Sequence, residues 1–164
     1  PPVLSSAASD VYKRQRQSAA AATSQRADSM KYMLDTNICI YIIKKRPQEV
    51  AKHFYKQAIM DIGVSSITVS EMTYGVEKSR NAEQNRIALL QFLSPLEISP
   101  YDASAANHYG EIRSLLEKAG QPIGALDTLI AAHARSLDAT LVTNNEKEFS
   151  RVPGLKTENW LHAS

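Results

Sequence analysis

Three carboxylates and one asparagine lie where predicted strands end or predicted helices begin. Asp35 follows the apolar run KYML, Glu71 comes shortly after the run IGVSSI, and Asp127 lies near the start of an alanine-rich stretch. Asn145 closes the segment TNN after a fourth apolar run. In open α/β sheets, groups at the carboxyl ends of the strands lie at one edge, where ligands bind. We therefore expect these side chains to lie together.

Carboxylates that converge repel one another and become easier to protonate, unless a cation neutralises them. Mg²⁺ and Mn²⁺ suit such a site because they take oxygen ligands. A bound ion of this kind lowers the pKa of water and orients it for in-line attack on a phosphodiester. We predict that Asp35, Glu71 and Asp127 hold Mg²⁺ or Mn²⁺, and that they and Asn145 are the catalytic residues. No zinc site is predicted, because Cys39 is the only cysteine and the four histidines lack ligand spacing.

Each of these residues also has a purely structural explanation. Asp35 can be a helix cap or an Asx-turn residue, and Glu71 can complete a capping box begun by Thr68. Asp127 suits a helix N-terminus, where the helix dipole favours negative charge, and Asn145 suits a turn. For any one residue alone, the structural explanation is at least as good as a site. Because all four are expected at the same edge of the sheet, the explanation as one site is favoured over four separate structural roles.

The apolar pattern and the helix start and stop signals predict alternating strands and helices. Thr36 is the expected N-cap of a helix over 37–46, which Pro47 ends. Further helices are expected at 48–60, 69–79, 82–93, 103–120 and 125–137, and strands at 31–35, 62–67, 96–100 and 139–145. This alternation indicates an α/β fold with a short central parallel sheet of four to five strands, flanked by helices.

The bulk composition fits one globular domain. The chain has 164 residues, of which 43% are hydrophobic and 22% are charged. No apolar run reaches the roughly 18 residues needed to span a membrane. From residue 30 onward, fifteen basic and fifteen acidic residues balance, so any contact with nucleic acid must use local patches. The single cysteine fits a reducing compartment.

Residues 1–29 differ from the rest, because they are rich in Ala, Ser and Gln and have almost no apolar pattern. We predict that they are disordered, since they bury too little apolar surface to offset the entropy of ordering. The segment DVYKRQ reverse-translates to GAT GTG TAT AAG AGA CAG, which matches a transposon end used in sequencing libraries. We interpret residues 1–29 as a non-native leader with the true start at Met30 or Met33, and a genomic reading frame that contains them would contradict this.

Four segments together resemble one family. They are MLDTNICIYIIKKRP, SSITVSEMTYGVEKS, GQPIGALDTLIAAHARSLDATLVTNNEKEFSRVPGL and TENW, in this order. From about Met30 to Trp160, the chain resembles the PIN domain and, more narrowly, the VapC toxins of bacterial type II toxin–antitoxin systems. The combination of D-T-N, E and G-x-x-D-x-x-I-A is specific, whereas any one of these motifs alone is weak.

The resemblance implies a PIN-like nuclease domain at residues 30–164, with Mg²⁺- or Mn²⁺-dependent endoribonuclease activity in the bacterial cytoplasm. It implies structured RNA as the substrate, often tRNA, and this subgroup suggests initiator tRNA. The implied protein partners are a VapB-type antitoxin, whose C-terminal tail covers the site, and a second copy in a homodimer.

The resemblance also carries residue roles to this sequence. Asp35, Glu71 and Asp127 match the acidic metal-site residues. The residues that match supporting positions are Thr36, Asn37 and Thr143. Many PIN domains carry aspartate where this chain has Asn145, so one ligand charge for a second metal ion is missing here.

Cations near the expected helix ends are candidates for RNA contacts. They are Lys44, Lys45, Arg46, Lys78, Arg80 and Arg86. The alternative explanation is that they complement the C-terminal helix dipoles and keep the surface soluble. Two other functions stay open from the residues: a catalytically decayed PIN-like module that binds RNA or a partner, and a nuclease that acts on DNA.

Overall fold

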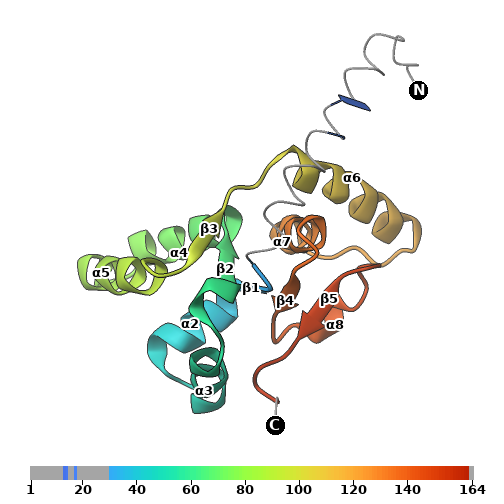
Figure 1. Ribbon diagram of the computed structural model, residues 1–164. Coiled ribbons are helices and arrows are strands. Elements are labelled where there is room, and N and C mark those ends of the chain that lie inside the picture. Colours follow the sequence, from blue (N-terminus) through green and yellow to red (C-terminus); the bar gives the residue numbers. More distant parts are fainter. Residues whose placement is uncertain (1–12, 15–16, 18–29, 163–164) are drawn as a thin grey trace.

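A short parallel sheet lies at the centre of the molecule (Figure 1). The computed structural model describes residues 13, 14, 17 and 30–162, and within these residues five strands have the order β3-β2-β1-β4-β5. The strands are β1 (Tyr32–Leu34), β2 (Ile62–Ser65), β3 (Glu97–Ser99), β4 (Thr140–Val142) and β5 (Lys156–Glu158). All neighbouring pairs are parallel, which confirms the predicted α/β class.

Helices connect the strands and cover both faces of the sheet. They are α2 (Thr36–Lys44), α3 (Gln48–Lys56), the 3₁₀ turn η1 (Ile59–Asp61), α4 (Ser66–Lys78), α5 (Ala82–Leu93), α6 (Ala103–Lys118), α7 (Ala125–Ser136) and α8 (Glu146–Phe149). Figure 1 shows α6 and α7 on one side of the molecule and α2 to α5 grouped on the other.

The two faces of the sheet have separate hydrophobic cores. Successive side chains of a strand point to opposite faces. In β1, Met33 therefore belongs to the core with α6 and α7, whereas Leu34 belongs to the core with α2 to α5. Trp160 is fully buried in the second core and fixes the C-terminal segment to it. Both faces are thus closed to solvent, and the edges of the sheet are left for a site.

The strand order reverses direction beside β1, which makes the carboxyl ends of β1 and β4 a topological switch point. From β1 the chain passes to β2 and β3 on one side, and then crosses to β4 and β5 on the other. Such a switch point is where ligands bind in open α/β sheets. Leu34 pairs with Val142 in the β1–β4 register. The residues that follow them, Asp35 and Thr143, therefore lie side by side at this edge.

Several predicted boundaries were wrong. The strands are shorter than predicted, and the single helix predicted over 48–60 is divided into α3 and η1. The N-cap of α2 is Asp35 rather than Thr36, because the Asp35 carboxylate accepts the N–H of Thr36. The short elements α8 and β5 had no predicted counterpart.

Two predictions concern residues near or outside the described part of the chain. The predicted disorder of residues 1–29 falls mainly on residues outside it, while Lys13, Arg14 and Gln17 are described as helical and exposed. Among the helices of the described residues, none has both the length and the apolar character to cross a membrane.

Candidate active site

Asp35 lies at the end of β1, where the strand meets α2, and its side chain is only 5% exposed. One carboxylate oxygen accepts a hydrogen bond from the backbone N–H of Thr36 at 2.8 Å. The other accepts a hydrogen bond from the hydroxyl of Thr143 at 2.9 Å. Burial raises the pKa of the Asp35 carboxyl, and these two hydrogen bonds partly offset the effect. Asp35 therefore caps α2 and is also a buried carboxylate at the sheet edge.

Glu71 reaches the same edge from α4. This helix begins earlier than predicted, because Ser65 caps it by accepting the N–H of Ile67 at 3.1 Å. Glu71 therefore lies in the second turn, and the predicted capping box with Thr68 is wrong. The carboxylate of Glu71 instead accepts a hydrogen bond from the hydroxyl of Thr36 at 3.0 Å. Thr36 thus links the first and second carboxylates of the site.

Thr143 and Asn145 lie directly after β4, at the same edge of the sheet as Asp35. The hydroxyl of Thr143 donates to Asp35 and accepts the backbone N–H of Asn145 at 3.0 Å. These two bonds fix the orientation of the hydroxyl. The predicted supporting residues Thr36 and Thr143 therefore contact the carboxylates. Asn37 is exposed, and within the described residues the structure shows no hydrogen bond from it to the site.

Asp127 lies in the first turn of α7 and faces the other carboxylates. The pKa of its carboxyl is raised to about 6, first by burial and then by the charge of Asp35. A hydrogen bond with Glu148 of α8, the charge of Glu148 and the charge of Glu71 contribute smaller parts of the same shift. The structure therefore places Asp127 within electrostatic range of Asp35 and Glu71, and adds a fourth carboxylate from α8 in contact with it.

The residue types fit a hard divalent cation, although the carboxylates do not form a closed cage. Within the described part of the chain, no three His, Cys, Asp or Glu side chains are close enough to one another to enclose a metal ion. The donors are all oxygen atoms, as Mg²⁺ and Mn²⁺ prefer. Burial is the largest cause of the raised pKa of Asp127, and repulsion from the neighbouring carboxylates adds to it; a cation would relieve this repulsion.

Comparisons with known proteins agree with this geometry. The sequence profile of the PIN domain matches residues 32–155. The chain belongs to the PIN domain family, among the VapC ribonucleases. The tRNA(fMet)-specific endonuclease VapC of Shigella flexneri is 48% identical over 132 residues, which are 80% of this chain and 98% of that protein. Ribonuclease VapC2 of Haemophilus influenzae is 51% identical over 132 residues, 80% of this chain and 99% of that protein.

Solved structures of the family have the same fold. In the VapBC2 complex of Rickettsia felis bound to a promoter DNA fragment, one chain matches with a TM-score of 0.74 and 48% identity, over 80% of this chain and 99% of that one. In the DNA-bound VapBC complex of Salmonella typhimurium, the match has a TM-score of 0.76 and 44% identity, over 80% and 98%. The predicted PIN-like fold and nuclease class are confirmed.

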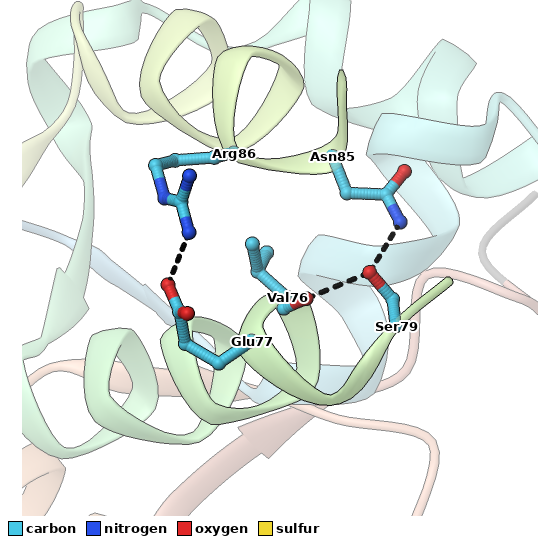
Figure 2. A network of polar contacts seen from close by, with 5 residues as sticks. All are labelled: Val76, Glu77, Ser79, Asn85 and Arg86. Atoms are coloured by element: carbon cyan, nitrogen blue, oxygen red, sulfur yellow. Dashed lines mark hydrogen bonds and ion pairs between the residues drawn. The ribbon is translucent and has the colours of Figure 1, made fainter. Parts of the chain in front are cut away.

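The predicted RNA-contact cations are all exposed but lie in different surroundings. Lys44 lies at the rim of a groove that also contains Glu71. Lys78 lies over the Tyr74 ring, 5.7 Å from its centroid. Figure 2 shows that Arg86 of α5 forms an ion pair with Glu77 of α4, so part of its charge is already neutralised.

The remaining candidates have fewer contacts to distinguish them. Lys45 lies at the left-handed C-cap of α2, beside a second groove between α2, α3 and α5. Arg46 follows directly, and Arg80 lies in the turn between α4 and α5. Of the six cations, Lys44 is the one that lines the same groove as Glu71, at the other end of α2 from Thr36.

Glu148 is the site residue that the sequence reasoning missed. A signal was present, because Glu148 comes three residues after Asn145, which is capping-box spacing. Asn145 does occupy the N-cap position of the short helix α8. Recognising that helix would have placed Glu148 in its first turn, next to the end of β4 and therefore close to the carboxylates.

Proposed function

We propose that this protein is the toxin of a type II toxin–antitoxin system, an endoribonuclease that uses Mg²⁺ or Mn²⁺ and acts in the bacterial cytoplasm. The observation that carries the proposal is the position of Asp35, hydrogen-bonded to Thr143 at the switch point of the sheet, beside Asp127, whose pKa is raised by burial and then by the charge of Asp35. The proposal is supported by relatives named as ribonucleases that are about half identical to this chain.

The side chains that would hold the ion are Asp35, Glu71 and Asp127. When bound, such an ion lowers the pKa of water and neutralises charge that develops on a phosphate. The chain itself fixes the geometry. Thr143 and the N–H of Thr36 keep both oxygens of Asp35 in place, and the Thr36 hydroxyl orients Glu71.

Glu148 and Lys44 have separate roles in this proposal. Glu148 hydrogen-bonds with Asp127, and this contact helps to raise the pKa of the Asp127 carboxyl. Lys44, at the end of α2 and in the same groove as Glu71, is the cation that would contact a phosphate of the RNA. Asn145 can add an uncharged amide oxygen near Thr143.

We propose structured RNA as the substrate, and initiator tRNA as the specific target. The VapC proteins of Shigella flexneri and Salmonella typhimurium, which are 48% and 44% identical to this chain, are named tRNA(fMet)-specific endonucleases. Sequencing of RNA ends after induction of the protein tests the target. Cleavage of other RNAs, with initiator tRNA left intact, would contradict it.

The proposed protein partner is a VapB-type antitoxin. VapBC complexes are the structural neighbours of this chain.

A groove of about 300 Å³ runs from Glu71 and Thr36 to Lys44. Its walls are apolar side chains of α2, α4 and α5, namely Ile40, Ile43, Met72, Val76 and Leu89. We propose that the antitoxin tail lies in this groove, and Val76→Glu tests this, because wild-type affinity of the variant for the antitoxin would contradict it.

We also propose a homodimer through the α4–α5 hairpin. Three large apolar side chains are exposed there: Tyr74, Ile87 and Leu90. Such side chains together on one surface are typical of an interface. Leu90→Glu is expected to convert the dimer to a monomer in analytical ultracentrifugation, and a wild-type protein that sediments only as a monomer would contradict the proposal.

The central experiment is the cleavage of tRNA by purified Asp35→Asn and Asp127→Asn variants with Mg²⁺ or Mn²⁺. Both are expected to fold and to lose cleavage and toxicity, because asparagine keeps the shape but removes the charge. Asp138→Asn is the matched control, since Asp138 is exposed, pairs with Lys156 and has a φ of 52° that asparagine tolerates. Full activity of Asp35→Asn would rule out the mechanism.

The decayed binding module remains the second function to test against. It predicts that Mg²⁺ and Mn²⁺ leave thermal stability unchanged and that no RNA is cut. Competition between single-stranded DNA and RNA in the same assay distinguishes a nuclease that acts on DNA.

A further inference from the structure

The imidazole of His133 is buried where α7 meets the sheet, and the proposed chemistry does not use it. His133 is 1% exposed. Its Nδ1 lies 2.8 Å from the hydroxyl oxygen of Ser65, and its Nε2 lies 3.2 Å from the hydroxyl oxygen of Ser99. Both serines are buried as well. One side chain of α7 thus bonds to two strands at once.

The two serines are equivalent positions of neighbouring strands. Ser65 is the last residue of β2 and Ser99 the last residue of β3, and they pair with each other in the sheet register. We call the contacts of His133 with Ser65 and Ser99 the serine–histidine bridge, or the bridge. The bridge therefore lies at the carboxyl edge of the sheet, the edge that carries the site. The Tyr101 ring packs edge-on against the imidazole, with 5.5 Å between the ring centroids.

A neutral imidazole satisfies this arrangement. The Ser65 oxygen already accepts the N–H of Ile67, so its own proton is available for Nδ1 of His133. Nε2 then carries the ring proton and donates to Ser99. This tautomer follows from the hydrogen-bond network. Both ring nitrogens are paired, as a polar side chain in a core requires.

The bridge connects two of the helices that carry carboxylates of the site, α4 and α7. Ser65 caps α4, and Glu71 follows it by six residues. His133 follows Asp127 by six residues in α7. A buried polar network with paired members defines one geometry, because any shift would leave a buried group without its partner. The position of α7 relative to α4 is therefore set at the bridge.

We propose that His133 is a positioning residue, which through Ser65 and Ser99 holds α7 so that Asp127 lies at the right distance from Glu71 and Asp35 to bind a divalent cation. The inference rests on the metal site of the proposed function. His133 itself contacts neither the cation nor the RNA in this proposal.

The test compares Ser99→Ala and His133→Leu with the matched control Ser136→Ala. Ser136 is also a buried serine, but among the described residues its hydroxyl donates only to the backbone carbonyl of His133 within α7. Mn²⁺ alone is titrated into each full-length protein by calorimetry. We expect about tenfold weaker Mn²⁺ binding for Ser99→Ala and His133→Leu, at the low end of what supporting residues cause at metal sites. Ser136→Ala should bind as the wild type does, and His133→Gln, whose amide can replace one hydrogen bond, should recover part of the affinity.

A folded Ser99→Ala protein with wild-type Mn²⁺ affinity would overturn the proposal, and so would equal losses in Ser136→Ala. Amide hydrogen exchange in the first turn of α7, measured without metal, provides a second readout. It should be faster in Ser99→Ala and unchanged in Ser136→Ala. If the wild type binds no Mn²⁺ and Asp127→Asn changes nothing, the metal site of the proposed function fails. In that case the exchange rates alone decide whether the bridge holds α7.

Discussion

Thr143 connects the end of β4 to the site through a single hydroxyl, which donates to Asp35 and accepts from Asn145. Thr143→Val keeps the shape but leaves one oxygen of a buried carboxylate unpaired. We expect a loss of stability of about 1–3 kcal/mol and a loss of kcat/KM of about 10–100-fold. Thr143→Ser keeps the hydroxyl and should stay near wild type. Chemical denaturation and a tRNA cleavage assay measure the two effects, and wild-type kinetics for Thr143→Val would contradict this role.

Glu148 should influence the site through the charge of Asp127. Glu148→Gln removes a neighbouring negative charge and supplies an amide donor, so the pKa of Asp127 should fall from about 6 toward its usual value. Titration of the Asp127 carboxyl by ¹³C NMR in the metal-free protein measures this shift. Glu146→Gln is the matched control, since Glu146 is on the same helix but pairs with Asn159. An unchanged Asp127 pKa in Glu148→Gln would show that the two carboxyls do not interact.

At the level of single residues, the sequence left Asp35 open between a helix cap and a metal ligand. The structure shows that these are not alternatives, because a carboxylate has two oxygens with several acceptor sites. One oxygen accepts the N–H of Thr36 and the other the hydroxyl of Thr143. Residue types and spacing therefore predicted where Asp35 lies, but the partner of its second oxygen depends on the β1–β4 register, which is a tertiary feature.

At the level of elements, prediction succeeded where local signals are strong. The helix over 82–93 has the predicted bounds, since Pro95 limits it. The start of α4 was wrong because Ser65, rather than Thr68, satisfies the free N–H groups of its first turn. The strand β5 has exposed residues and no apolar alternation, so only pairing with β4 identifies it. Short edge strands of this kind depend on tertiary pairing more than on their own sequence.

Lys44 at the end of α2 and Arg86 of α5 should contribute differently to RNA binding. Lys44 lines the groove that also contains Glu71, whereas Arg86 is paired with Glu77 on the α4–α5 hairpin (Figure 2). We expect Lys44→Ala to weaken tRNA binding several-fold and to reduce the salt dependence by about one ion. Arg86→Ala, the matched control, should change either quantity much less. Fluorescence anisotropy in the Asp35→Asn background measures both, and equal effects of the two substitutions would contradict this assignment.

At the level of the whole molecule, the site should lower stability at neutral pH when no cation is bound. The raised pKa of Asp127, about 6 instead of 3.8, means that the folded state holds more protons than the unfolded state between these values. The free energy of unfolding should therefore fall as the pH rises from about 4 to about 6. The raised pKa of Asp35 acts in the same direction. The lowered pKa of His53 acts in the opposite direction just below pH 6.5, but its side chain is only partly buried.

The loss of stability at neutral pH should disappear when Asp127 loses its charge or when a cation binds. Asp127→Asn is expected to stabilise the metal-free protein at pH 7 by about 1 kcal/mol, less than the full pKa shift would give, because Asp127 is partly exposed. Mn²⁺ at about 100 times its dissociation constant should stabilise the wild type by about 2.7 kcal/mol at the same pH. It should stabilise Asp127→Asn much less, since a ligand is missing. Thermal unfolding at pH 4.5 and pH 7, with and without Mn²⁺, tests both effects. Equal stabilisation of the two proteins by Mn²⁺ would mean that the cation binds elsewhere, because only a site that includes Asp127 can exchange the repulsion among these carboxylates for attraction to the metal.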